Sequence, residues 1–89
     1  MANSIGRECR PVVIEVRGRR GSYYVATLLK WLEELREFLE YELGCEVKVR
    51  FEEEETPYPL LIVNGKLVFE GLPGEEGYLI ELIRSSLGH

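Results

Sequence analysis

The sequence predicts a small α/β fold: one domain with the element order β-α-β-β-β-α, a four-stranded mixed sheet and both helices on one face of that sheet. Three observations lead to this prediction. Apolar residues recur with a helical period over residues 23–43, alternating residues follow at 46–51, and Asn64-Gly65 separates two short apolar runs. The 89 residues are 45% hydrophobic and 30% charged, which is typical of a single globular domain spanning residues 1–89.

The chain begins with a polar stretch, residues 1–10, which we expect to be a flexible lead-in. It has no apolar segment of the kind that a secretion signal requires, so a cytoplasmic location is expected. Pro11 then opens a β-branched run, residues 12–17, and Gly18 ends it. This run is predicted to be the first strand, because β-branched side chains favour a pleated, partly buried surface.

Residues 23–43 are predicted to form one long amphipathic helix. Ser22 in front of it is the expected N-cap, and Gly44 behind it is the expected left-handed stop. Apolar residues recur at the helical period, and these are expected to face the core. They are Val25, Leu28, Leu32, Leu35, Leu39 and Leu43, with Tyr24, Trp31 and Phe38 in an adjacent stripe.

The second half of the chain predicts three strands and a closing helix. Residues 46–51 alternate between apolar and charged side chains, which indicates a strand with one buried face, at an edge of the sheet. An acidic loop, residues 52–55, leads to a hairpin whose Asn64-Gly65 turn accepts the positive φ values of type I′. Residues 73–76 are expected to start the last helix. Its predicted buried stripe consists of Tyr78, Leu79, Leu82, Ile83 and Leu87.

These elements fix much of the topology. The first two strands run parallel through a right-handed crossover, and the tight turn makes the last two antiparallel. The loop between the second strand and Pro59 is too short for another helix, so one face of the sheet is expected to have no helical cover. That face should combine Val13, Glu15, Arg17, Lys48 and Arg50 with one alternate set from the hairpin, drawn from Leu61, Val63 and Val68.

Apolar side chains on an uncovered sheet face favour association. We therefore expect a homodimer, or a protein partner, that contacts the chain through this face or through an edge strand. The alternative is a monomer whose long charged side chains lie over the apolar patch.

Composition argues against several classes of function. The net charge is −5, and the basic residues are scattered apart from Arg17, Arg19 and Arg20, so no nucleic-acid partner is expected. No apolar run approaches about 18 residues, so no membrane partner is expected. The one histidine is His89, and no His, Cys or carboxylate cluster has metal-ligand spacing, so neither a metal nor a cofactor is predicted. All 16 acidic residues are Glu, a bias in the direction of thermophile proteins.

The hairpin carries a resemblance to a known family. Pro59 stands six residues before Gly65 and opens a short apolar strand, and this spacing resembles that of glutaredoxins and small archaeal thioredoxins. The resemblance implies a minimal thioredoxin-like fold with a cis-proline at Pro59. The missing helix before the hairpin and the segment Gly74-Glu75-Glu76-Gly77-Tyr78 are similar to the selenoprotein W-like group.

The reactive cysteines of these families are absent from the expected positions. Aligned on Ile14, the thioredoxin-like register puts Ser22 and Val25 there, and the selenoprotein W-like register puts Arg17 and Arg20 there. Disulfide exchange needs a thiolate, which an unactivated serine cannot replace. The sequence therefore favours a thioredoxin-like binding or assembly module without redox chemistry, which is not expected to be an enzyme. The alternative is a diverged thiol-disulfide oxidoreductase that uses Cys9 or Cys45.

Two cysteines stand elsewhere in the chain. Cys9 and Cys45 each lie just before one of the two strands predicted to pair in parallel, and parallel neighbours start at the same end of a sheet. A structural disulfide between them would close about 36 residues and stabilise the fold by roughly 4 kcal/mol in the chain-entropy model. The alternative is two unpaired thiols, the usual state in a reducing cytosol. The sequence leaves both open.

The start of the long helix is the candidate ligand-binding site. Unpaired amides and the helix dipole favour an anion there, and two guanidinium groups add bidentate capacity. By the resemblance, the backbone beside the expected cis-proline faces the same cleft, and the ligand is a small anion, an acidic peptide or a thiol cofactor. The alternative, which we favour, is that the arginines are ordinary exposed residues on a Glu-rich surface. The candidate residues are Arg19, Arg20, Gly21, Ser22, Tyr23, Tyr58 and Pro59.

Overall fold

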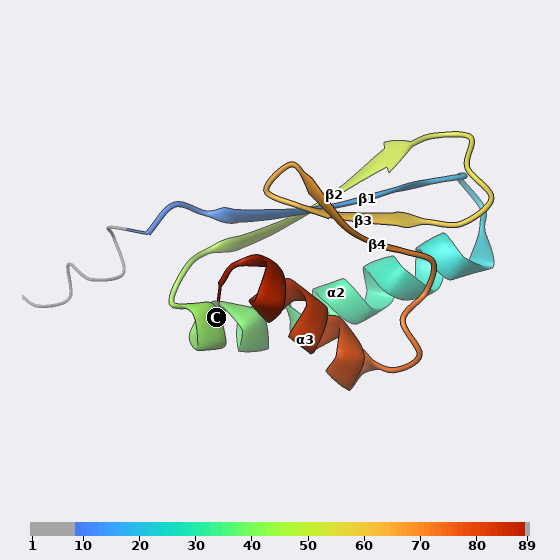
Figure 1. The fold of residues 1–89 in the computed structure, drawn as a ribbon. Coiled ribbons are helices and arrows are strands. Elements are labelled where there is room, and N and C mark those ends of the chain that lie inside the picture. Colours follow the sequence, from blue (N-terminus) through green and yellow to red (C-terminus); the bar gives the residue numbers. More distant parts are fainter. Residues whose placement is uncertain (1–8, 89) are drawn as a thin grey trace, which may run out of the picture.

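Two helices lie on one face of a four-stranded sheet in the computed structural model, which describes residues 9–88 (Figure 1). The predicted element order and the placement of both helices on one face are confirmed. None of the helices in the described residues is long and apolar enough to cross a membrane. The elements are β1 Val12–Gly18, α2 Tyr23–Leu43, β2 Val47–Glu53, β3 Leu60–Val63, β4 Lys66–Glu70 and α3 Glu76–Ser86.

The sheet has the strand order β2-β1-β3-β4. β1 pairs with β2 in parallel, and Val12 lies opposite Val47. β3 pairs antiparallel with both β1 and β4, and Ile14 of β1 lies opposite Val63 of β3. The predicted parallel and antiparallel pairings are confirmed, and β2 is an edge strand as predicted.

The core lies between the sheet and the two helices. β1 contributes every second residue, Val12, Ile14 and Val16, because successive side chains of a strand point to opposite faces. The other buried apolar residues come from the remaining elements. They are Val25, Leu28, Leu32 and Leu39 of α2, Val47 of β2, Leu61 and Val63 of β3, and Leu79 and Ile83 of α3.

The two ends of α2 have the predicted caps. The side-chain oxygen of Ser22 accepts a hydrogen bond from the backbone N–H of Val25 at 3.4 Å. Gly44 has a φ of 70°, and its N–H donates to the carbonyl of Glu40 at 2.8 Å. A left-handed residue at this position satisfies a carbonyl group that the helix leaves without a partner.

The aromatic residues are less buried than the sequence predicts. Tyr24 and Phe38 on α2 and Tyr78 on α3 are each 45% exposed. They lie on the flanks of their helices, beside the residues that face the sheet. Tyr78 packs edge-to-face on Phe69 of β4, with 5.7 Å between the ring centroids. To bury these aromatic side chains as well, another element would have to pack against the outer flanks of the two helices. The described residues contain no such element.

The hairpin turn has the predicted conformation and one function that the sequence analysis missed. Asn64 has a φ of 51° and Gly65 a φ of 84°, as a type I′ turn requires. The Asn64 side-chain oxygen also accepts a hydrogen bond from the Val13 N–H at 2.9 Å. In return, the Asn64 N–H donates to the Val13 carbonyl at 2.8 Å. Asn64 therefore extends the pairing of β1 and β3 by one residue.

The open face of the sheet carries a different hairpin set from the one expected. Leu61 and Val63 face the helices and are buried, and Val68 packs against the same core. The open face instead receives Leu60, Ile62 and Leu67, because Glu15 lies opposite Ile62 and Arg17 opposite Leu60. An irregularity in β4 opposite Leu61 and Ile62 shifts the register by one residue, so Ile62 pairs with Leu67 and Leu61 with Phe69.

Cys9 and Cys45 form a disulfide, with 5.6 Å between their Cα atoms. The structural disulfide, one of the two alternatives that the sequence left open, is therefore present. It lies at the end of the sheet where β1 and β2 both begin. The predicted lead-in, residues 1–10, lies outside the described residues except for its last two positions. The bridge closes a sequence separation of 36 residues that contains β1 and α2.

The expected cis bond before Pro59 is wrong. No peptide bond among residues 9–88 is cis. The trans isomer is the lower-energy form of an X–Pro bond by about 0.5–1 kcal/mol. Pro59 is fully buried, and its carbonyl accepts a hydrogen bond from the Gly71 N–H at 2.7 Å.

Loss of the disulfide should destabilise the domain by about 4 kcal/mol, because the bridge removes loop-closure entropy from the unfolded chain. The measurement is denaturant unfolding with and without a reductant. The Cys9→Ser, Cys45→Ser double variant should match the reduced protein and should not respond to the reductant. Two titratable thiols in the unreduced, denatured protein would contradict the bridge.

Asn64→Ala should destabilise the domain by about 2 kcal/mol, from the strain of a left-handed alanine and the loss of the bond to Val13. Asn64→Gly tolerates the turn and loses the hydrogen bond alone, so about 1 kcal/mol is expected. Urea unfolding of both variants measures these values. An equal loss in the two variants would show that turn strain contributes nothing.

Candidate functional site

A shallow, open cavity of about 430 Å³ lies where β1 gives way to α2. It contains five of the seven predicted ligand-binding residues. Its lining consists of Arg19, Arg20, Gly21, Ser22, Tyr23, Tyr24 and Pro57. Tyr58 lies beside it, with its ring centroid 6.4 Å from that of Tyr24, whereas Pro59 is buried and does not line it. Sequence reasoning missed Tyr24 and Pro57 as lining residues.

Gly18 allows three segments to converge beneath this cavity. A Cβ atom at this position would lie 2.6 Å from Cγ2 of Val25 and 3.5 Å from the Cα of Pro59. The end of β1, the first turn of α2 and the start of β3 therefore meet around a residue without a side chain. The Gly21 φ of 91° then turns the chain into α2, and the Ser22 N–H donates to the Arg19 carbonyl at 3.1 Å.

The arginines near the cavity are paired with the acidic loop. Arg20 Nε lies 3.3 Å from a carboxylate oxygen of Glu53, and Arg19 Nε lies 3.5 Å from one of Glu55. Arg20 also lies over the ring of Phe51, 5.5 Å from its centroid. The negative charges of Glu53 and Glu55 therefore offset the positive charges of Arg20 and Arg19 where β1 and β2 end. The acidic residues were expected to form a separate solvated loop.

A signal for this pairing was present in the sequence. Because β1 and β2 are parallel, their C-terminal ends meet, and Gly18 lies opposite Glu53 in the register. The basic residues that follow β1 and the acidic residues that end β2 are thus brought to one place. Exposed ion pairs contribute about 0–1 kcal/mol each, so a stronger anion can compete for these guanidinium groups.

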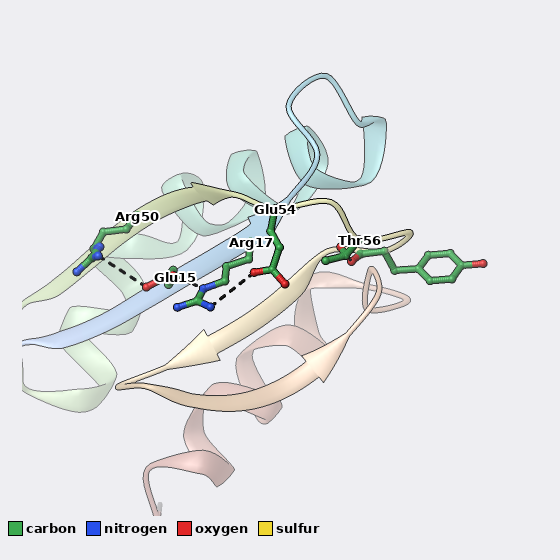
Figure 2. A network of polar contacts seen from close by, with 6 residues as sticks. Glu15, Arg17, Arg50, Glu54 and Thr56 are labelled. Carbon is green, nitrogen blue, oxygen red and sulfur yellow. Dashed lines mark hydrogen bonds and ion pairs between the residues drawn. The ribbon is translucent and has the colours of Figure 1, made fainter.

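A second polar cluster lies on the open face of the sheet (Figure 2). Glu15 is 9% exposed, and its carboxylate accepts a hydrogen bond from Arg17 Nε at 2.5 Å and lies 3.8 Å from Nη2 of Arg50. Arg17 also forms an ion pair with Glu54, with 3.6 Å between Nη1 of Arg17 and Oε1 of Glu54. The hydrogen bond from Arg17 to Glu15 raises the pKa of Arg17 above its usual value, and the charge of Glu15 adds to the shift.

This cluster joins the open face to the cavity. Arg17 is on β1 and Glu54 is in the acidic segment after β2. The same segment supplies Glu55 to Arg19, and Glu53 at the end of β2 pairs with Arg20. Further along the same loop, the Thr56 hydroxyl donates to the carbonyl of Tyr58, which fixes the backbone beside the cavity (Figure 2). The acidic loop is therefore held by contacts to both β1 and its own backbone.

The sulfur atoms lie far from this cavity. The disulfide precedes β1 and β2, whereas the cavity follows β1, so the seven-residue strand separates them by roughly 20 Å. Both cysteines are in the disulfide. In the described residues, no group of three or more His, Cys, Asp or Glu side chains has an arrangement suited to a metal ion.

Comparison with known proteins gives no family assignment. No protein-family model matches the chain, and no curated protein is significantly similar to it.

Removing the competing carboxylates should strengthen anion binding at the cavity. The double variant Glu53→Gln, Glu55→Gln frees Arg20 and Arg19, so sulfate affinity should rise several-fold over that of the unmodified chain at low salt. Calorimetric titration with sulfate, phosphate and glutathione measures this effect.

The control adds Arg19→Ala and Arg20→Ala to the same background, and these changes should remove the gain. Equal affinity in all three proteins would mean that the cavity is not an anion site. In that case the arginines only balance the Glu-rich surface.

Proposed function

We propose that this chain is a thioredoxin-like module that lacks thiol-disulfide chemistry and acts as a binding or assembly component. The element order and the strand directions agree with the fold that the resemblance to glutaredoxins and small archaeal thioredoxins implies. The observation that carries the proposal is the location of the sulfur. Cys9 and Cys45 are bonded to each other at the opposite end of β1 from Ser22.

The groups at the start of α2 support a structural role for Ser22. Its hydroxyl oxygen accepts a hydrogen bond from the Val25 N–H and so caps the helix. Disulfide exchange requires a thiolate that attacks sulfur, and the cavity at this position is lined by arginine, tyrosine, serine, glycine and proline residues. Val25, the second position of the thioredoxin-like register, is buried in the core.

The ligand class that fits the cavity is a small anion or an acidic peptide. Arg19 and Arg20 supply the positive charge, and Tyr23, Tyr24 and Tyr58 surround them with exposed aromatic surface. Tyr23 is 74% exposed and Tyr58 is 53% exposed. Aromatic rings and arginines are the side chains most enriched at protein interfaces, which favours a peptide segment over a buried small molecule.

The competing function is that of a diverged oxidoreductase. The disulfide between Cys9 and Cys45 is the oxidised form that such an enzyme would hold, and Cys45 is partly exposed. Its distance from the cavity means that a substrate would have to bind at the other end of the sheet. The two functions therefore predict different results in one assay.

Insulin reduction with dithiothreitol should show no turnover above the rate with dithiothreitol alone. The Cys45→Ser variant should give the same rate as the unmodified chain. Turnover that this substitution abolishes would replace the proposed function with the oxidoreductase. Ser22→Ala serves as a control, because it removes a helix cap without touching the sulfur.

A further inference from the structure

The outer edge of β2 offers a row of backbone groups to a further strand. In the parallel ladder, the Val12 N–H donates to the Glu46 carbonyl and the Glu54 N–H donates to the Gly18 carbonyl. Even-numbered residues of β2 therefore bond to β1, and odd-numbered ones point their N–H and C=O groups outward. The outward Val47 N–H donates to the Glu40 side chain at 2.9 Å. Within residues 9–88, the outward N–H and C=O groups of Val49, Phe51 and Glu53 make no hydrogen bond.

The charges along this edge are arranged for antiparallel pairing with an identical strand. On the open face, Lys48 and Arg50 are followed by Glu52 and Glu54 at every second position. If a second copy pairs about a twofold axis at Phe51, each Arg50 lies opposite a Glu52 and each Lys48 lies opposite a Glu54. Opposite charges directly across a strand pair are stabilising. Among residues 9–88, Lys48 and Glu52 have no salt bridge within the chain.

This register also gives hydrogen-bond partners to the outward backbone groups of β2. An axis at Phe51 makes the two copies of Phe51 a hydrogen-bonded pair, and it pairs Val49 with Glu53 in the same way. Moving the axis to Arg50 or Glu52 places two identical charges opposite each other, and moving it to Val49 places Lys48 opposite Arg50. An axis at Val47 also avoids like-charge pairs, but it would need the Val47 N–H, which already donates to the Glu40 side chain. Phe51 is therefore the position at which both the charges and the free backbone groups suit pairing.

The helix side of the same edge presents apolar surface beside Phe51, next to Arg20, which lies over the Phe51 ring. A cavity of about 200 Å³ lies between α2 and β2, and its apolar part is lined by Val25, Ala26 and Leu29 of α2 together with Phe51. Arg20, Gly21 and Ser22 line its other end. Leu29 and Phe51 are both partly buried and pack against the core. A strand placed beside β2 would bring its own Phe51 next to this cavity and cover it.

The other edge of the sheet is less suited to pairing. β4 contains the register irregularity opposite Leu61 and Ile62, and such a bulge twists an edge away from a flat partner. β2 pairs over seven consecutive positions without an irregularity. The two edges of one sheet thus differ in how easily a further strand can add.

We propose that a second copy of this chain pairs antiparallel with β2 about a twofold axis at Phe51, so that two four-stranded sheets join into one. This inference rests on the proposed assembly function and names its partner and surface. Six backbone hydrogen bonds form across the new strand pair, from the outward groups of Val49, Phe51 and Glu53. Four ion pairs form on the open face, two between Arg50 and Glu52 and two between Lys48 and Glu54. Arg50 and Glu54 also have a charged partner within their own chain, Glu15 and Arg17 respectively.

Charge reversal tests the register. Arg50→Glu alone and Glu52→Arg alone each put like charges opposite each other twice, so self-association should weaken roughly tenfold or more. An equimolar mixture of the two variants restores opposite charges and should form a heterodimer. Glu70→Arg makes the same charge change on β4 and should leave the dimer intact. Analytical ultracentrifugation at about 1–100 µM and low salt measures all five samples, including the unmodified chain.

Two results would overturn the proposal. One is a monomeric mass for the unmodified chain over the whole concentration range, and the other is a dimer that neither Arg50→Glu nor Glu52→Arg weakens. Heterodimer formation in the mixture shows that both variants are folded. The insulin assay reports separately on the proposed function: a β2-paired dimer with cysteine-dependent turnover would refute the non-redox function alone, and an inactive monomer would refute the pairing alone.

Discussion

The parallel pairing of β1 with β2 is the constraint on which the rest of this structure depends. It aligns Val12 with Val47 and Gly18 with Glu53, and so brings two distant chain segments together at both ends. At the first end, Cys9 meets Cys45. At the second end, the basic residues after β1 meet the acidic residues that end β2. The disulfide and the charged cavity therefore lie at opposite ends of the β1–β2 pair, one strand length apart.

Much of this arrangement could be predicted from the sequence, because the relevant signals are local or follow from topology. Asn64-Gly65 specifies its turn through positive φ values, and Ser22 and Gly44 specify the ends of α2 through their caps. The right-handed crossover then makes β1 and β2 parallel. From that one deduction the position of the disulfide follows without any knowledge of the side-chain packing.

The parts that could not be predicted depend on register and on competition between side chains. A shift of one residue moves a strand's side chains to the other face, so the sequence alone could not place Leu61 and Val63 in the core and Ile62 on the open face. Arg19 and Arg20, named from the sequence as candidate ligand-binding residues, line the cavity at the start of α2. Their partners in the acidic loop were missed, because a run of glutamates indicates repulsion until a basic segment is known to lie beside it.

The open face of the sheet shows why a sheet face without helical cover need not bind a partner. Ile62 lies on this face and is nevertheless only 9% exposed, and Glu15 opposite it is exposed to the same extent. The side chains of Arg17 and Arg50 both contact Glu15, and they remain 42% and 60% exposed. A partner that docked on this face would have to accommodate or displace the ion pairs of Glu15, whose side chain is only 12% exposed. Addition of a strand at the β2 edge leaves the contact between Arg17 and Glu15 in place, and the outward backbone groups of β2 gain hydrogen bonds. Association through an edge is therefore favoured over association through the face.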